Sequence, residues 1–301
     1  MSSVNYPSDT GVYHNIDKSL QEKQRVVIYH QTDSSLLPLV TLPRAARKPK
    51  SVTHINIAAF HILDTPGDIH LNNVPPDDSY YEQLWKTVSG LQQFGVKVLG
   101  MLGGAAQGSY KHLDDDEKFE DYYGPLRDMI KKFALDGMDL DVEENMSLNG
   151  IERLVNRLNS DFGDDFIITL APVASALSDG ANLSGFSYSD LEKDCGDKIN
   201  WYNTQFYSGF GSMDNKDDYV NIVNNGWPPS KVIAGVLTNQ DNGSGYVDLD
   251  DLKNTLKELT KSYDDFGGVA GWEYFNSVPG GKSRPWEWAL VMQQTIDGQS
   301  D

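Results

Sequence analysis

Eight short apolar runs, most of them rich in β-branched residues, alternate along this chain with segments whose apolar residues recur at helical spacing. Near-continuous hydrophobicity within a short run is typical of a strand in a parallel sheet that is covered on both faces. The runs span residues 25–29, 51–60, 96–101, 137–142, 166–170, 199–207, 231–237 and 268–274. This alternation predicts an α/β protein built as a (β/α)8 TIM barrel, with its reactive side chains at the C-terminal ends of the strands. A doubly wound open sheet is the weaker alternative, because no glycine-rich phosphate loop follows the first run.

The segments between the runs show the spacing of amphipathic helices. Apolar residues fall at positions 81, 84, 85 and 88, again at 151, 154, 155 and 158, and in a similar way at 249, 252, 256 and 259. A chain of 301 residues can bury one sizeable core. We therefore expect residues 25–301 to form one catalytic barrel and residues 1–24 to form an N-terminal extension. Residues 238–267, between the last two runs, are too few for an inserted α+β domain.

Charge limits the classes of partner. The formal net charge of -19 argues against nucleic acid and anionic membranes, because both repel such a surface. No stretch approaches the roughly 18 apolar residues that a membrane span needs. A neutral partner such as a carbohydrate is compatible with this charge, and we expect the protein to act as a monomer.

Cysteine and histidine limit the chemistry. The single cysteine, Cys195, excludes an intrachain disulfide, and the six histidines form no HxxxH or HxH pair, so we expect no metal and no cofactor. The polar first residues lack the apolar core of a secretory signal. Glycosylation sequons begin at Asn145, Asn182 and Asn242, and a glycan on the first would crowd the carboxylates beside it. We expect a cytoplasmic protein, with secretion after removal of a signal as the alternative.

The segment 135–144, LDGMDLDVEE, carries the most informative pattern. In a strand, alternation sends Asp139, Asp141 and Glu143 to one face and the apolar residues between them to the other. The apolar face suits the helices outside a barrel, so the three carboxyl groups face inward. Mutual repulsion raises the pKa of at least one of them. A carboxylic acid that keeps its proton near neutrality is what glycosidic bond cleavage requires.

Two other interpretations of this segment remain open. It could be an acidic stretch on a solvated helix or loop, although the alternating apolar residues would then be unexplained. It could bind a divalent cation, which would need further ligands from neighbouring strand ends. Glu143 stands last in the strand and has the longest side chain, so we expect it to be the general acid.

These residues resemble glycoside hydrolase family 18. Residues 136–143, DGMDLDVE, match the family's DxxDxDxE signature on the fourth predicted strand. Residues 98–104 resemble its SxGG element, although Met101 stands where serine is usual, and residues 205–207 resemble its QFY element. The resemblance covers residues 25–295. Its segments VVIYHQT, LGMLGGAA, ITLAPVASAL, LSGFSYSDL, WYNTQFYSGFGSM, GWEYFNSVPGG and PWEWA are most similar to the filamentous-fungal endo-β-N-acetylglucosaminidases of the family.

The resemblance implies a retaining mechanism without a protein nucleophile. Glu143 would protonate the leaving oxygen while the substrate's 2-acetamido oxygen attacks the anomeric carbon, and would then activate water against the oxazolinium. Asp141 would orient the acetamido group, and Asp139 would share a proton or hydrogen bond with Asp141. Tyr207 would donate its hydroxyl to the acetamido carbonyl. Asp136 lies off the alternation of the strand, so we expect it to have a structural role.

The resemblance also implies a set of substrate-binding residues, with Trp272 as the apolar floor beneath the sugar: Gln205, Trp272, Tyr29 and Phe60. The expected activity is cleavage of the chitobiose core of high-mannose N-glycans on glycoproteins. The alternative is a chitinase that cuts β-1,4-linked N-acetylglucosamine polymers with the same chemistry. A catalytically dead, lectin-like relative is the third possibility, although such relatives typically lack the acid that Glu143 supplies.

Overall fold

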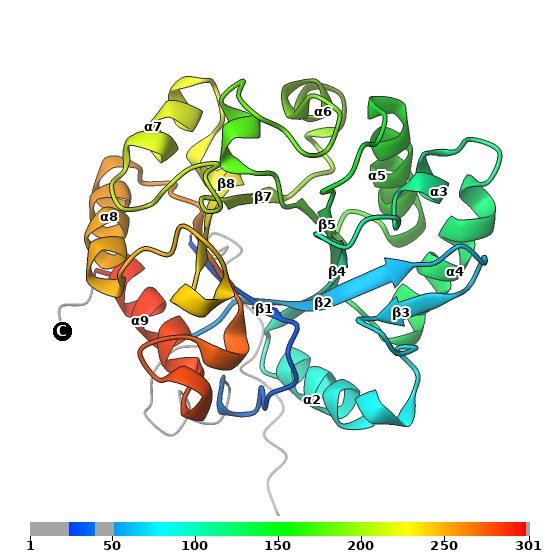
Figure 1. The fold of residues 1–301 in the computed structure, drawn as a ribbon, viewed down its shortest axis with the longest axis horizontal. Coiled ribbons are helices and arrows are strands. Elements are labelled where there is room, and N and C mark those ends of the chain that lie inside the picture. The colour runs from blue at the N-terminus through cyan, green and yellow to red at the C-terminus, as the bar shows by residue number, and fades with distance from the viewer. Residues whose placement is uncertain (1–23, 40–50, 299–301) are drawn as a thin grey trace, which may run out of the picture.

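The computed structural model describes residues 24–39 and 51–298 of the chain (Figure 1). Eight parallel strands close into a barrel with helices around it, which confirms the predicted (β/α)8 fold. Each strand overlaps one of the predicted runs. The strands are β1 (Arg25–His30), β2 (His54–Ile62), β4 (Lys97–Gly103), β5 (Gly137–Asp141), β6 (Ile167–Leu170), β7 (Trp201–Gln205), β8 (Val232–Leu237) and β9 (Gly268–Trp272).

The sheet closes through the pairing of β1 with β2. The strand order is β1-β9-β8-β7-β6-β5-β4-β2, and the closing register places Val27 opposite His54. A short strand that the sequence did not predict, β3 (Ile69–Leu71), pairs antiparallel with the end of β2. Figure 1 shows this pair extending past the rim of the barrel. Three residues are too few to show a periodicity, which is why β3 escaped prediction.

The helices lie outside the barrel and bury the apolar faces expected of them. In α5, the side chain of Ser147 accepts a hydrogen bond from the backbone N–H of Gly150 and so starts the helix. Its buried residues include Ile151, Leu154 and Leu158, which the spacing had placed on one face. The α-helices are α2 (Glu82–Gln93), α3 (Lys111–Asp114), α4 (Phe119–Lys132), α5 (Leu148–Phe162), α6 (Tyr188–Cys195), α7 (Asp217–Asn224), α8 (Leu249–Ser262) and α9 (Trp286–Ile296).

Short 3-10 helices are found in the connections between these elements. Several precede or follow a strand end and so shape the rim of the barrel. They are η2 (Ser79–Tyr81), η3 (Ala174–Leu177), η4 (Pro229–Lys231), η5 (Gln240–Asn242), η6 (Tyr274–Asn276) and η7 (Gly281–Ser283).

The apolar core has two parts. The larger lies between the strands and the surrounding helices and includes Met138, Leu140 and Val142. The smaller fills the inside of the barrel and includes Tyr29 and Trp201. The interior is therefore packed, and substrate can reach the strands only at their ends.

The connection from β8 to β9 contains η5 and α8 and no inserted domain, as predicted. Within the part of the chain that the structure describes, no helix has both the length and the hydrophobicity needed to cross a bilayer. The N-terminal extension predicted for residues 1–24 lies almost entirely outside the described residues.

Candidate active site

A cleft of about 430 Å3 opens at the C-terminal ends of the strands. Five of the residues that the sequence placed in the site line it together, from three different strands or the loops that follow them. They are Asp141, Glu143, Gln205, Tyr207 and Trp272. This is the face at which (β/α)8 barrels carry their reactive groups.

Strand β5 positions the carboxylates as its alternation predicted. Asp139 is fully buried inside the barrel, Asp141 is 6% exposed, and Glu143 lies two residues beyond the end of the strand, half-buried at the cleft. Gly103 on the neighbouring strand has a φ of +91°, and a Cβ atom on it would collide with the backbone oxygen of Asp141. A side chain there would separate the two strand ends, so glycine is required by both conformation and space.

Asp139 is held by hydrogen bonds from three strands. Its Oδ2 accepts from the hydroxyl of Tyr29 at 2.8 Å, and its Oδ1 accepts from Thr169 Oγ1 at 2.5 Å and from Asn203 Nδ2 at 2.9 Å. Burial raises the pKa of Asp139, and these hydrogen bonds work against that rise. The described structure contains no hydrogen bond between Asp139 and Asp141, in contrast to the expectation, so the two interact through their charges.

Gln205 joins Asp141 to Glu143. Its Nε2 donates to Asp141 Oδ1 at 3.2 Å and to Glu143 Oε1 at 3.1 Å, and it is held by the backbone oxygen of Ala171 at 2.8 Å. Burial raises the pKa of Asp141 well above its usual range, and the nearby charges of Glu143 and Asp139 raise it further. Asp141 therefore keeps a proton at pH values where an exposed aspartate is ionised.

Tyr207 and Trp272 form the other walls of the cleft. Burial raises the pKa of the Tyr207 hydroxyl well above its usual range, and the charges of Asp141 and Glu143 add to the rise. Tyr207 thus remains a hydrogen-bond donor at any physiological pH. The ring of Trp272 packs on Tyr29 with its centroid at 5.5 Å and is left half-exposed toward the cleft.

Residues 25–274, most of the chain and all of the barrel strands, match the Glycosyl hydrolases family 18 domain. The chain belongs to glycosyl hydrolase family 18. It is therefore a glycoside hydrolase that acts on carbohydrate, as the carboxylates of β5 had indicated.

Solved structures from the family are similar over almost the whole chain. A fungal endo-β-N-acetylglucosaminidase is 51% identical with a TM-score of 0.86, and the match covers 92% of this chain and 99% of the other. Chitinase ChiC from Aspergillus fumigatus is 52% identical with a TM-score of 0.81, and the match covers 91% and 99%. Chitinase 2 from Rhizopus oligosporus is 30% identical over 200 residues, which is 60% of this chain but 34% of that protein. The chain thus matches about a third of the length of that curated relative.

Two of the predicted substrate-binding residues do not line the family 18 cleft. Tyr29 is 7% exposed and directs its hydroxyl to Asp139, so it supports the carboxylates from below. Phe60 is 0% exposed and packs outward, against Trp85 of α2. The register of β2 shifts between Ile57 and Phe60, so that successive residues, Ala58 and Ala59, face the interior and the alternation reverses after them. The expectation for Phe60 was therefore wrong.

The structure adds residues that the sequence analysis did not single out. After the irregularity in β2, His61 lines the cleft together with Ala59. Gln31, which directly follows β1, lines it as well. The carboxylate of Glu273 accepts hydrogen bonds from the backbone N–H and the hydroxyl of Thr32, at 2.8 and 2.9 Å. For His61 and Gln31 the available signal was a polar residue one or two positions beyond a predicted strand run. Glu273 lies inside the predicted run 268–274 and carried no such signal.

Asp136 has the structural role expected of it. Its Oδ2 accepts from the backbone N–H of Val98 and from Gln92 Nε2, both at 2.9 Å, and its Oδ1 pairs with Lys97 at 3.1 Å. The first carboxylate of the DxxDxDxE motif thus joins β4 to β5 at the bottom of the barrel. It lies at the opposite end of the strand from Glu143.

Proposed function

We propose that this enzyme cleaves glycosidic bonds with retention and with the substrate's own acetamido group as the nucleophile. The observation that carries the proposal is the distribution of carboxylates. Among the described residues that line the cleft, the carboxyl groups are Asp141 and Glu143, which lie two residues apart on one wall. A double displacement by two carboxylates needs an ionised nucleophile on the opposite side of the sugar, about 5–5.5 Å from the acid. Asp141 is buried and holds its proton, so it is a poor candidate for that role.

The geometry supports a two-step reaction. The acetamido oxygen attacks the anomeric carbon while Glu143 gives its proton to the leaving oxygen, so that one C–O bond forms as the other breaks. Tyr207 donates its hydroxyl to the acetamido oxygen, and a carboxyl oxygen of Asp141 accepts from the acetamido N–H and orients the group as the oxazolinium forms. Water then attacks the anomeric carbon, Glu143 takes the proton from that water, and the oxazolinium ring opens. Gln205 keeps Glu143 in place through both steps.

For the substrate, we propose the chitobiose core of high-mannose N-glycans. The absence of an inserted domain between β8 and β9 leaves the cleft without a high wall on that side. A second hollow of about 370 Å3 adjoins the cleft and shares Gln31 and Trp272 with it. An open, branched set of cavities suits a branched glycan better than a single linear chain. The 51% identity to a fungal endo-β-N-acetylglucosaminidase supports the same proposal.

A chitinase is the second candidate, because chitinase ChiC is similar at 52% identity. The chemistry needs an acetamido group only on the sugar that carries the attacked carbon, so it permits both substrates. Digestion of a high-mannose glycoprotein beside chitotetraose separates the two. We expect mass spectrometry to show one N-acetylglucosamine left on each glycosylated asparagine. An intact glycoprotein, with chitotetraose readily cut, would identify a chitinase instead.

A further inference from the structure

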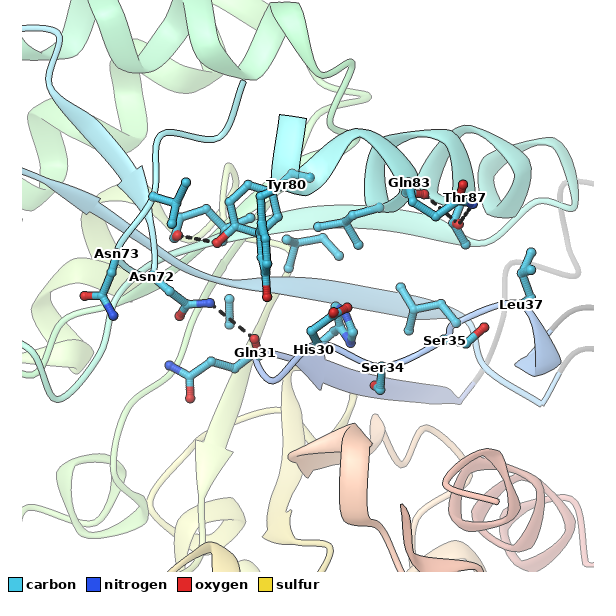
Figure 2. A pocket seen from close by; sticks show the side chains of 18 residues that line it. His30, Gln31, Ser34, Ser35, Leu37, Asn72, Asn73, Tyr80, Gln83 and Thr87 are labelled. Carbon is cyan, nitrogen blue, oxygen red and sulfur yellow. Dashed lines mark hydrogen bonds between the residues drawn. The ribbon is translucent and has the colours of Figure 1, made fainter. Parts of the chain in front are cut away.

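A third cavity, of about 650 Å3 and distinct from the 370 Å3 hollow, lies beside the catalytic cleft between β1, β3 and the start of α2 (Figure 2). We call it the β3 cavity. Its volume falls within the range of about 300–1,000 Å3 that is typical of small-molecule sites. It borders the cleft directly, because Gln31 lines both.

The β3 cavity contains a buried polar group without a partner. His30 lines it and is 4% exposed, and its Nδ1 has no hydrogen-bond partner among the described residues. Burial lowers the pKa of His30 to about 4, so the imidazole is neutral near pH 7. A buried polar atom without a partner costs free energy, so the wall of the cavity retains unused hydrogen-bonding capacity at His30.

Gln31 is fixed between the cleft and the β3 cavity by its backbone. Its N–H donates to Glu273 Oε2 at 3.3 Å, and its backbone oxygen accepts from Asn72 Nδ2 at 3.2 Å. The side-chain carboxamide of Gln31 has no partner among the described residues. It is therefore free to bind a ligand that extends from one cavity into the other.

Two further side chains at the rim are available for binding. Figure 2 shows Tyr80 projecting from η2, just before α2, toward the side on which His30 and Gln31 lie. Tyr80 is 61% exposed, and its hydroxyl makes no hydrogen bond within the described part of the chain. Asn73, in the turn after β3, is exposed and likewise has no side-chain partner there.

The lining indicates a neutral ligand with many hydroxyl groups. It combines carboxamides, hydroxyls and a neutral imidazole with apolar side chains such as Leu84 and Val74, and none of its described residues is a lysine or arginine. Sugars present hydroxyls at their edges and C–H groups on their faces, and an exposed tyrosine ring offers a surface for such a face. An anionic ligand would find no lysine or arginine among the described lining residues, and Asp33 would repel it.

We propose that the β3 cavity binds an α-mannose arm of the branched glycan while the chitobiose core occupies the catalytic cleft. This inference rests on the proposed function, and it assigns the α-mannose arm of that substrate to the β3 cavity. Gln31 contacts the glycan where it passes between the two cavities. Tyr80 and Asn73 hold the arm at the rim, and the neutral imidazole of His30 forms part of the inner wall.

Calorimetric titration of the wild-type enzyme with free α-linked mannopentaose tests the site without hydrolysis, because this sugar has no acetamido group. We expect binding, and a Kd raised about three- to tenfold by Tyr80→Ala and by Asn73→Ala, the loss expected for one removed contact. The matched control is Phe94→Ala. Phe94 is 44% exposed at the other end of α2 and lines neither cavity, so its loss leaves the Kd unchanged.

Kinetics give a second measurement. Tyr80→Ala raises KM for a high-mannose glycopeptide by the same factor and leaves kcat unchanged, and it alters neither constant for a short fluorogenic chitobioside that reaches only the cleft. Absence of mannopentaose binding, or an unchanged Kd in both rim variants, overturns the inference. A wild-type enzyme that binds mannopentaose through Tyr80 but leaves glycoprotein intact upholds the site and removes the proposed endo-β-N-acetylglucosaminidase activity.

Discussion

Gln205 donates a hydrogen bond from its side-chain nitrogen to Oε1 of Glu143, at 3.1 Å. The same nitrogen reaches Asp141 and a backbone oxygen on the loop after β6. One amide thus fixes the relative positions of the two carboxyl groups that face the cleft. Because the amide is held from two further sides, Glu143 is oriented before any substrate arrives.

Glu143→Gln should abolish hydrolysis and leave the fold intact, because the change removes the proton donor and keeps the shape. We expect the rate on a high-mannose glycopeptide to fall by a factor of at least about 100, within the range typical of a general acid. The melting temperature should stay within a few degrees of wild type. Glu117→Gln, at an exposed position, is the control and should keep full activity. Activity of the Glu143 variant above a tenth of wild type would refute its assignment as the acid.

Asp141→Asn should slow hydrolysis about 100-fold, because the carboxyl group that orients the acetamido N–H for attack is replaced by an amide. The variant should still use a preformed sugar oxazoline as a donor, since that substrate has already passed the first step and Glu143 remains. Chromatography of the transfer product, beside the rate of glycopeptide hydrolysis, provides the measurement. Normal hydrolysis by the variant between pH 4 and pH 8 would exclude this role for Asp141.

The buried Asp141 should also make stability depend on pH. Because its pKa is raised in the folded state, the folded protein holds a proton that the unfolded chain releases above about pH 4. Stability is therefore lost as pH rises from the unfolded toward the folded pKa, at about 1.4 kcal/mol per pH unit for one proton. Asp141→Asn removes this dependence, so the difference in melting temperature between variant and wild type should grow from pH 4 to pH 7 in favour of the variant. A constant difference would mean that Asp141 is ionised in the folded protein.

Tyr29→Phe should reduce activity although Tyr29 does not line the cleft. The change removes the 2.8 Å hydrogen bond to Asp139, at a cost of about 1–3 kcal/mol in unfolding free energy. With less support for its charged form, the pKa of Asp139 rises further, so the pH–activity profile of kcat should move while KM changes little. An unaltered profile with the same loss of stability would make Tyr29 a packing residue only.

Phe60→Leu provides the contrasting case. Phe60 is fully buried and packs toward α2, away from the cleft. We expect a loss of about 1–3 kcal/mol in unfolding free energy from the altered packing and an unchanged KM. A raised KM at full stability would restore Phe60 as a substrate-binding residue.

Chelation should leave activity unchanged. The oxygens of Asp139 accept three hydrogen bonds, and Asp141 and Glu143 are joined by Gln205, so the carboxylates are satisfied by protein donors. The described residues contain no group of three or more potential metal ligands. Assays with and without EDTA test this. Loss of activity that calcium or magnesium restores would establish the cation site that the sequence left open.

The sequence by itself determined the barrel and the carboxylate array. Eight runs of strand-forming residues appeared as eight strands because near-continuous hydrophobicity suits only strands covered on both faces. The side chains of Asp139, Asp141 and Glu143 point to the same face of the strand, because alternation is a local property of an extended chain. The role of Asp136 was also readable, since it lies off that alternation and meets its partners on the adjacent strand.

Only the tertiary structure decided which other side chains meet the substrate. The direction of Phe60 depends on an irregularity in β2 that no residue spacing reveals. Tyr29 was expected at the substrate but reaches Asp139, which is 110 residues away along the chain. Glu273 holds the segment after β1 across a separation of 241 residues. Such contacts follow from the closure of the barrel, which pairs the first strand with the last. Local sequence patterns carry no information about contacts between residues so far apart in the chain.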